Sequence, residues 1–183
     1  MSSPRRSRDR VIAAVFVVAA IAAQSYWLGH GVILLSLGLI ITYLVWALTP
    51  WKNEPARVLP TYLLAIVVQC VHFTEEFITG FQRQFPKVLG SSEWTDAQFV
   101  TFNMAWLAVF VLAVLGVYRR MQLAYLVVLF LALIGGVGNG TSHLLLAATH
   151  GGYFPGLVTA PLCLLVGIAV LGRLFGQTRE HVK

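Results

Sequence analysis

Three side chains that could transfer protons or bind a metal lie close together in one apolar stretch. They belong to the run His72-Phe73-Thr74-Glu75-Glu76, whose flanking residues are mostly Leu, Ile, Val and Phe. The chain has only seven acidic residues, and two of them are adjacent here. Because a carboxylate is costly to place in hydrocarbon, ionisable residues in an apolar segment are candidates for a functional site.

The spacing of these residues predicts a single polar face. In a helix, His72, Glu75 and Glu76 occupy positions i, i+3 and i+4, which lie on the same side. Gln69 falls on the same stripe, whereas the other faces are apolar. One polar stripe on an apolar helix indicates that this side faces the interior of a helical bundle or a cavity.

Several kinds of chemistry fit this residue set. Histidine and carboxylate are the ligands of zinc and non-haem iron, so one divalent metal, zinc or iron, could be held by His72, Glu75, Glu76 and His143. Without a metal, two adjacent carboxylates in a low dielectric titrate apart and supply an acid and a base. Ion or proton transport, and a purely structural hydrogen-bond network, are the remaining alternatives.

Other apolar segments contribute polar residues at a similar depth. Asn103 lies early in one segment, and Asn139, Ser142 and His143 lie late in the next. At about 1.5 Å per residue, these groups fall roughly 5–15 Å below the same membrane surface as His72. The predicted catalytic set is therefore His72, Glu75, Glu76, Asn103, Asn139 and His143. The predicted substrate pocket is Gln69, Phe73, Phe77, Trp106, Ser142 and Tyr153.

The composition indicates which elements position these residues. The sequence is 58% hydrophobic and only 11% charged, which excludes an ordinary soluble domain of 183 residues. We expect an all-α, polytopic transmembrane helical bundle. Six apolar segments, each close to the ~20 residues that span a bilayer, cover residues 11–28, 32–48, 58–80, 97–117, 122–147 and 156–175.

The placement of positive charge predicts the orientation of these six spans. With the N-terminus inside, all of the 13 Lys and Arg residues except Arg83 and Lys87 fall on the inner side. Both termini are then cytoplasmic, and the protein is integral to the cytoplasmic membrane. Residues 1–10 form a basic N-terminal segment, 11–175 one transmembrane domain and 176–183 a cytoplasmic tail.

Smaller features complete these expectations. The basic charge follows membrane topology, so no nucleic-acid partner is expected. Cys70 and Cys163 are interpreted as buried apolar residues and not as a disulfide or zinc pair. The glycine-rich stretch 135–140 fits close helix packing or a locally unwound backbone beside a cavity. Pro161 is expected to kink the last span. The sequence is also compatible with a homodimer.

The combined pattern resembles a known family. His72-x-x-Glu75-Glu76, followed by Asn103, Asn139, His143 and Tyr153-x-Pro155-Gly156, is similar to the HXXEE-motif family of bacterial membrane proteins over residues 58–160. That family is described by its motif, so the resemblance implies a membrane protein without naming a reaction. A looser likeness to sterol-isomerase-type membrane bundles concerns architecture alone.

These expectations lead to two hypotheses about function. The first is a membrane-embedded enzyme that acts on a lipophilic small molecule, such as an isoprenoid, polyketide or lipid, by hydrolysis, isomerisation or cyclisation. The second is an ion- or proton-coupled transporter or binding protein that uses the same carboxylates.

Overall fold

The computed structural model describes residues 4–49, 51 and 54–180, and all regular elements in these ranges are helical. The α-helices are α1 (Pro4–Leu28), α2 (Ile33–Leu48), α3 (Pro55–Thr79), α4 (Phe81–Val88), α5 (Asp96–Tyr118), α6 (Gln122–Phe130), α7 (Asn139–His150) and α8 (Ala160–Glu180). A 3-10 turn, Gly29–Val32, joins α1 to α2, and a π-helix, Leu131–Gly138, joins α6 to α7. The predicted all-α class is confirmed.

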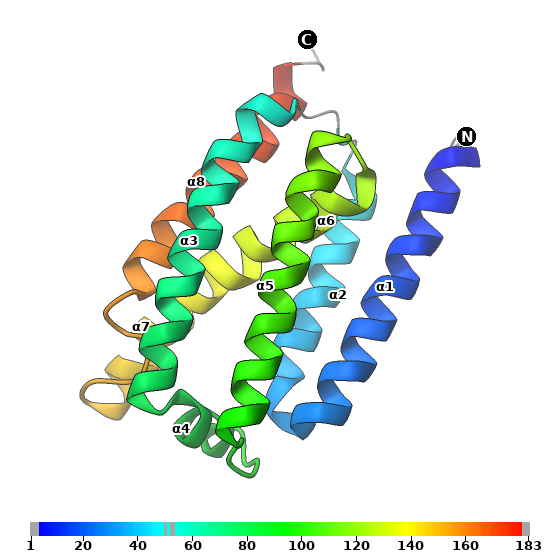
Figure 1. Cartoon of the computed structure of the whole chain (residues 1–183). Coiled ribbons are helices and arrows are strands. Elements are labelled where there is room, and N and C mark those ends of the chain that lie inside the picture. The colour runs from blue at the N-terminus through cyan, green and yellow to red at the C-terminus, as the bar shows by residue number, and fades with distance from the viewer. Residues whose placement is uncertain (1–3, 50, 52–53, 181–183) are drawn as a thin grey trace.

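Four helical stretches are long and apolar enough to cross a membrane. They are Arg6–Leu48, Pro55–Thr79, Asp96–Tyr118 and Gln122–His150, and a shorter apolar helix covers Ala160–Gly176. The first stretch folds back at its 3-10 turn, so that α1 and α2 run antiparallel (Figure 1). The chain is therefore a multi-pass helical membrane protein.

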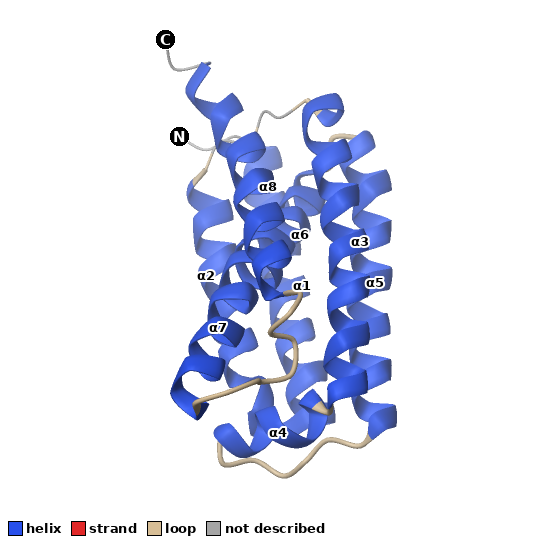
Figure 2. Ribbon diagram, turned by 90° about the vertical axis from the view of Figure 1, so that its left-hand side faces the viewer, coloured by secondary structure: helices blue, strands red, loops and turns tan. Residues whose placement is uncertain are grey.

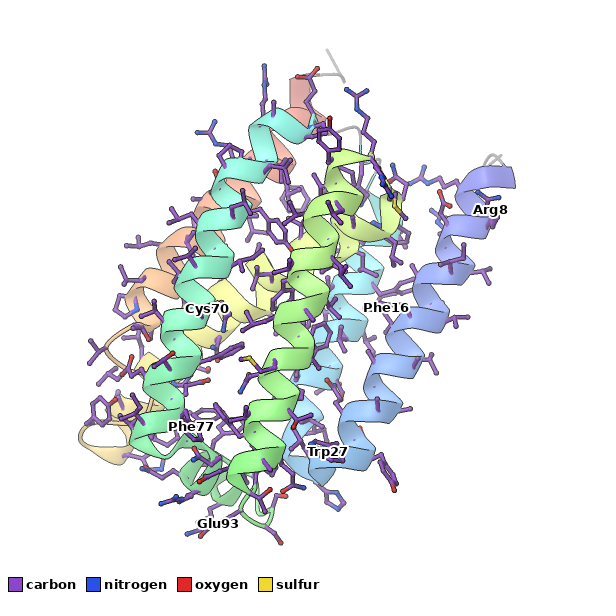
Figure 3. The ribbon with its side chains drawn as sticks, in the orientation of Figure 1. Arg8, Phe16, Trp27, Cys70, Phe77 and Glu93 are labelled. Carbon is purple, nitrogen blue, oxygen red and sulfur yellow. The ribbon has the colours of Figure 1, made fainter. Side chains whose placement is uncertain are left out.

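Hydrogen bonds across the first helical hairpin hold α1 beside α2. Near one end, Arg10 Nη2 donates to the Ala47 carbonyl at 2.6 Å. Near the other, Gln24 Nε2 donates to Ser36 Oγ at 2.8 Å. The two ends of the bundle also differ in charge, since Figure 3 shows Arg8 and Glu93 at opposite ends.

Apolar side chains cover much of the outer surface of the bundle, as hydrocarbon surroundings allow. Val15, Ile78 and Leu112 are each more than 60% exposed. Cys70 also lies on this surface, so the prediction that both cysteines are buried is wrong for Cys70 and confirmed for Cys163. Cys70 occupies an outward-facing position of α3, where a small apolar side chain meets lipid as readily as protein.

The half of the bundle where α1 begins and α8 ends has a packed core. Tyr62 on α3 is fully buried, and its hydroxyl donates to the Phe110 carbonyl of α5 at 2.9 Å. Trp46 Nε1 donates to the Gln122 carbonyl at 3.0 Å and ties α2 to α6. Buried polar groups with partners of this kind fix helix packing without leaving an unsatisfied donor.

The opposite end is closed by α4 and the segment that follows it. Trp94 is buried, and its Nε1 donates to the Leu28 carbonyl at 3.0 Å. Thr95 caps α5 in a reciprocal capping box with Gln98. Gln98 Nε2 also donates to the Trp27 carbonyl at 2.8 Å. These bonds fasten the cover to α1 and α5.

The glycine-rich stretch packs tightly against α8. A Cβ at Gly136 would lie 2.6 Å from the Gly167 Cα, and one at Gly140 would lie 2.6 Å from the Ala160 carbonyl oxygen. The close-packing interpretation is thus confirmed. The backbone is not unwound: it continues as a π-helix, an irregularity that often accompanies functional sites.

The connection between α7 and α8 turns back into the bundle. In Figure 2 this loop, residues 151–159, rises from the end of α7 to the start of α8 near the middle of the molecule. Phe154, Gly156 and Thr159 are buried. The last apolar helix therefore starts at Ala160 and not at residue 156, and Pro161 lies in its first turn, where it starts the helix instead of kinking it.

Candidate functional site

Three buried side chains converge below the α4 cover. Glu76 Oε1 lies 3.3 Å from His72 Nε2 and 3.1 Å from His143 Nε2. One ligand atom from each of the three residues lies within 4.8 Å of the others, and all three residues are at most 3% exposed. Two of these edges match the ~3.3 Å ligand spacing around a tetrahedral metal with bonds of about 2.0–2.1 Å.

Hydrogen bonds determine which nitrogen of His72 carries the proton. Thr159 Oγ1 lies 2.5 Å from Glu75 Oε2 and donates to it, because an ionised carboxylate only accepts. The same hydroxyl lies 2.6 Å from His72 Nδ1 and must accept from it, so Nδ1 carries the proton. The lone pair of Nε2 therefore points into the cluster, where Asn139 Nδ2 lies 2.8 Å away.

This arrangement places two acceptors next to each other. Nε2 of His72 accepts from the Asn139 amide and also lies 3.3 Å from Glu76 Oε1, so a metal ion bound there would replace the amide hydrogen as the partner of Nε2. A hydrogen bond from the second ring nitrogen to a polar partner, here Thr159, is also the usual outer-shell support of a metal-bound histidine.

His143 is the third member of the cluster, and its ring nitrogens have no hydrogen-bond partner among the described residues. Both of these nitrogens are buried. The 3.1 Å approach of Nε2 to Glu76 is thus a close contact without hydrogen-bond geometry. Because an unsatisfied buried nitrogen is costly, a ligand that accepts its lone pair would stabilise this arrangement. The donor set fits a divalent metal.

Gly156 gives the two histidine rings their space. Its φ is +91°, and a Cβ there would lie 2.5 Å from His143 Cε1 and 3.0 Å from His72 Cε1. Only glycine combines this backbone conformation with such close contact. The buried loop thus forms one wall of the site, which agrees with the rule that irregular backbone at membrane depth lies against protein or a cavity.

Glu75 lies outside this cluster. Its Oε1 accepts from the Tyr153 hydroxyl at 2.7 Å and the Val158 N–H at 2.9 Å. Its Oε2 accepts from the Thr159 N–H at 2.8 Å and from the Thr159 hydroxyl. The carboxylate thus holds the start of α8, where the helix dipole favours a negative charge. Partial burial raises the pKa of the Tyr153 phenol, and Glu75 acts in the same direction, so the hydroxyl remains a donor.

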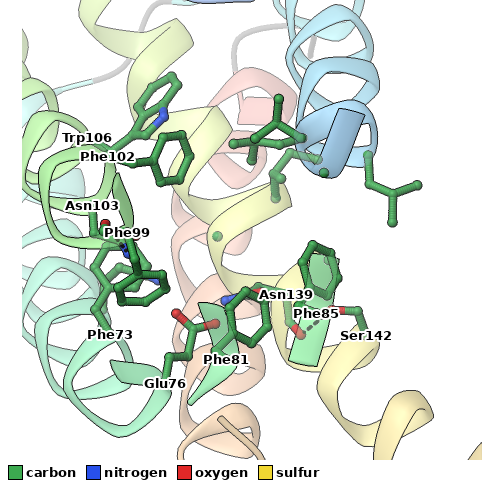
Figure 4. Close-up of a pocket in the computed structure, with 18 of the residues that line it drawn as sticks. Phe73, Glu76, Phe81, Phe85, Phe99, Phe102, Asn103, Trp106, Asn139 and Ser142 are labelled. Carbon is green, nitrogen blue, oxygen red and sulfur yellow. Dashed lines mark hydrogen bonds between the residues drawn. The ribbon is translucent and has the colours of Figure 1, made fainter. Parts of the chain in front are cut away.

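A cavity of about 290 Å³ extends from Glu76 into the bundle (Figure 4). Polar groups gather at one side, where Glu76 and Asn139 face it, and aromatic rings such as Phe102 and Trp106 line the far side. The predicted residues that line it are Gln69, Phe73, Glu76, Asn103, Trp106, Asn139 and Ser142. Its size and mostly apolar lining are typical of small-molecule sites.

Two residues predicted for the pocket lie elsewhere. Phe77 is 39% exposed on the outside of α3 and does not line the cavity. Tyr153 is 51% exposed and contacts Glu75. Thr159 and Gly156 contact the cluster but were not predicted to belong to the site. Thr159 lies two residues before Pro161, which is a helix-start signal, and Pro155-Gly156 is a turn signal, so both residues could have been found from the sequence.

The matched family agrees with this geometry. A family model described as a protein of unknown function with an HXXEE motif matches residues 63–171, which include every residue of the cluster and the buried loop. Comparison with curated proteins and with solved structures finds no match. Because the family model covers more than half of the chain, the protein belongs to the HXXEE-motif family, whose function is unknown.

Proposed function

We propose that this protein is a membrane-embedded enzyme that holds one divalent metal, zinc or iron, at His72, Glu76 and His143. The observation that carries the proposal is the convergence of two buried histidine nitrogens on Glu76 Oε1, at 3.3 and 3.1 Å, beside a cavity. Two histidines and one glutamate leave a coordination position open, as in catalytic zinc sites.

The substrate class follows from the cavity. Its aromatic lining suits a lipophilic small molecule, and the amides of Gln69, Asn103 and Asn139 can orient a polar group beside Glu76. When bound, a divalent metal polarises an oxygen of the substrate or lowers the pKa of a water. Hydrolysis, isomerisation and cyclisation are all reactions that this combination supports.

The proposal includes a membrane topology. Six passes, formed by α1, α2, α3, α5, the continuous α6–α7 helix and α8, place both termini on one side. The positive charges near the start of α1 and between α5 and α6 make that side cytoplasmic. The site then lies in the outer half of the cytoplasmic membrane, under α4.

Proton-coupled transport is the second candidate, and one observation favours it. Hydrogen bonds link the half-exposed Tyr153 through Glu75 and Thr159 to the buried His72. Such a chain can pass protons. The core on the other side is mostly apolar, and the Tyr62 hydroxyl and Trp46 indole there donate to backbone carbonyls, so we favour the enzyme.

Metal analysis tests the proposal directly. Purified protein should contain about one zinc or iron per chain, His143→Gln should lose it, and the exposed-histidine control His150→Gln should keep it. Metal retained by His143→Gln, or none in the wild type after growth with zinc or iron, would contradict the proposal. Proton uptake in liposomes by metal-free protein would favour transport.

A further inference from the structure

A second hollow lies beside the cavity, between α1 and α5. It measures about 500 Å³ and is lined on α1 by Phe16, Trp27 and small residues that include Ala19, Ala20 and Ala23. Figure 3 marks Phe16 and Trp27 along α1, which stands beside α5. Ala19 and Ala23 are exposed, so this groove opens toward the lipid.

The groove and the cavity share two side chains. Phe102 and Trp106 of α5 belong to both linings, so they form the partition between the two spaces. Trp106 is buried, whereas Phe102 is only half-buried. The cavity has carboxylate and amide groups among its aromatic rings, whereas the groove is lined mainly by alanines and aromatic side chains.

Access from the aqueous side is blocked at this end. Phe81 of α4 lies with its ring centroid 5.3 Å from that of His143, and Trp94 and Phe154 pack around it. These buried rings form the cover above the cluster. A substrate that enters from the bilayer avoids this barrier.

We propose that the groove binds the apolar chain of an amphiphile whose polar head lies in the cavity beside Glu76 and Asn139. The inference rests on the proposed function and narrows its substrate to a molecule with one hydroxyl-bearing head and one long hydrocarbon chain. The polar groups of the cavity suit the head of such a molecule, and the mainly apolar lining of the adjoining groove suits its chain. The chain reaches the site from the bilayer, between α1 and α5.

Photolabelling can test this assignment. The probe is a long-chain alcohol that carries a diazirine in its chain and a terminal alkyne, added to the full-length protein in lipid nanodiscs. We expect labels on the groove-facing peptides of α1 and α5. Labels on α2 and α7, where the cavity approaches Leu34 and Ser142, or labels spread evenly over all lipid-facing helices, would overturn the proposal.

Adjacent alanines provide matched variants. Ala23→Phe fills the groove, whereas Ala22→Phe places the same ring on an exposed position outside it. The filled groove should lower α5 labelling about tenfold or more in Ala23→Phe only, which corresponds to a loss of at least about 1.4 kcal/mol in binding free energy. On α5, Ala105→Phe and its exposed control Ala108→Phe repeat the comparison if Ala23→Phe misfolds. Equal labelling in variant and control would overturn the proposal.

Metal content separates the two proposals. The groove variants should keep about one metal per chain, because Ala23 and Ala105 do not contact the His72–Glu76–His143 cluster. Loss of labelling with metal retained supports the groove. Labelling that Ala23→Phe does not reduce, in protein that still binds metal, overturns the groove proposal and leaves the metal site standing. Metal-free wild type with groove-specific labelling overturns only the metal site.

Discussion

Glu75 and Glu76 are neighbours in the chain, but they face two different regions of the molecule. Glu75 meets the loop before α8 and accepts four hydrogen bonds from Tyr153, Val158 and Thr159. Glu76 is buried at the edge of the cavity, and the ring nitrogens of two histidines approach one of its oxygens. The protein supplies hydrogen-bond donors to the Glu75 carboxylate, whereas the Glu76 carboxylate lies beside the ring nitrogens of His72 and His143.

One short motif can therefore serve two purposes. Successive residues of a helix point about 100° apart, so adjacent glutamates reach different neighbours. Glu75 fixes the loop and, through Thr159, the proton on His72 Nδ1. A cation between Glu76 and the two histidines would displace the Asn139 amide from His72 Nε2. We infer that Glu75 is a positioning residue and Glu76 a ligand.

The largest effect is expected where the two regions meet, at Gly156. Gly156→Val would place a side chain against both histidine rings at a φ of +91°. Strain and overpacking together should lower the free energy of unfolding by about 3 kcal/mol or more and abolish metal binding. Denaturant titration in micelles and elemental analysis measure the two losses.

A second glycine of the same loop is the control for this variant. A Cβ at Gly152 would meet nothing within 4 Å, so Gly152→Ala should change neither property. If Gly156→Val binds metal normally, the loop is not a wall of the site.

Exchanging each glutamate separately tests the division of roles. Glu76→Gln should abolish metal binding while the metal-free protein keeps its stability, because a buried charge is removed. Glu75→Gln should lower the free energy of unfolding by about 1.5–3 kcal/mol, as charged hydrogen bonds are lost. It should keep the metal with about 10–100-fold weaker affinity. The reverse pattern would show that the two roles are assigned the wrong way round.

Thr159 connects the two regions, and its hydroxyl can be removed alone. Thr159→Val should leave His72 Nδ1 without an acceptor and weaken zinc affinity about 10–100-fold. Thr159→Ser keeps the hydroxyl and should restore most of the affinity. Competition with a zinc chelator measures both. Equal zinc affinity in Thr159→Val and Thr159→Ser would show that Glu75 does not act on the metal site through Thr159.

The smallest effect is expected at Tyr153, on the outer side of Glu75. Tyr153→Phe removes one donor and should cost about 0.5–1.5 kcal/mol, toward the lower end because Tyr153 is 51% exposed. Tyr26→Phe, at a 90% exposed position, is the control and should cost nothing measurable.

Tyr153 also gives stability a dependence on pH. Its pKa in the folded protein is raised, so its contribution is complete below the unfolded value of about 10 and is lost as pH rises above it. Tyr153→Phe should therefore flatten the alkaline loss of stability. An unchanged alkaline limb would exclude this phenol as its source.

Much of the site could be predicted from the sequence because helical periodicity is local. His72 and Glu76 are one turn apart, and Asn139 and His143 repeat that spacing, so both pairs were expected to face inward. The rule fails for Glu75, since a helical face is broad and its edge residues can turn toward a neighbouring element. It fails also for Phe77, which lies on the lipid side.

The sequence by itself determined that this chain is a helical membrane protein whose polar residues gather in one region. Hydropathy, charge bias and the i, i+4 pairs are short-range signals, and they are enough for that. Only the tertiary structure decided that residues 151–159 turn back into the bundle, that Gly156 admits both histidine rings, and that Thr159 links Glu75 to His72. The hydrogen bonds from Thr159 to Glu75 join residues 84 positions apart, and their geometry depends on how α3 and α8 pack.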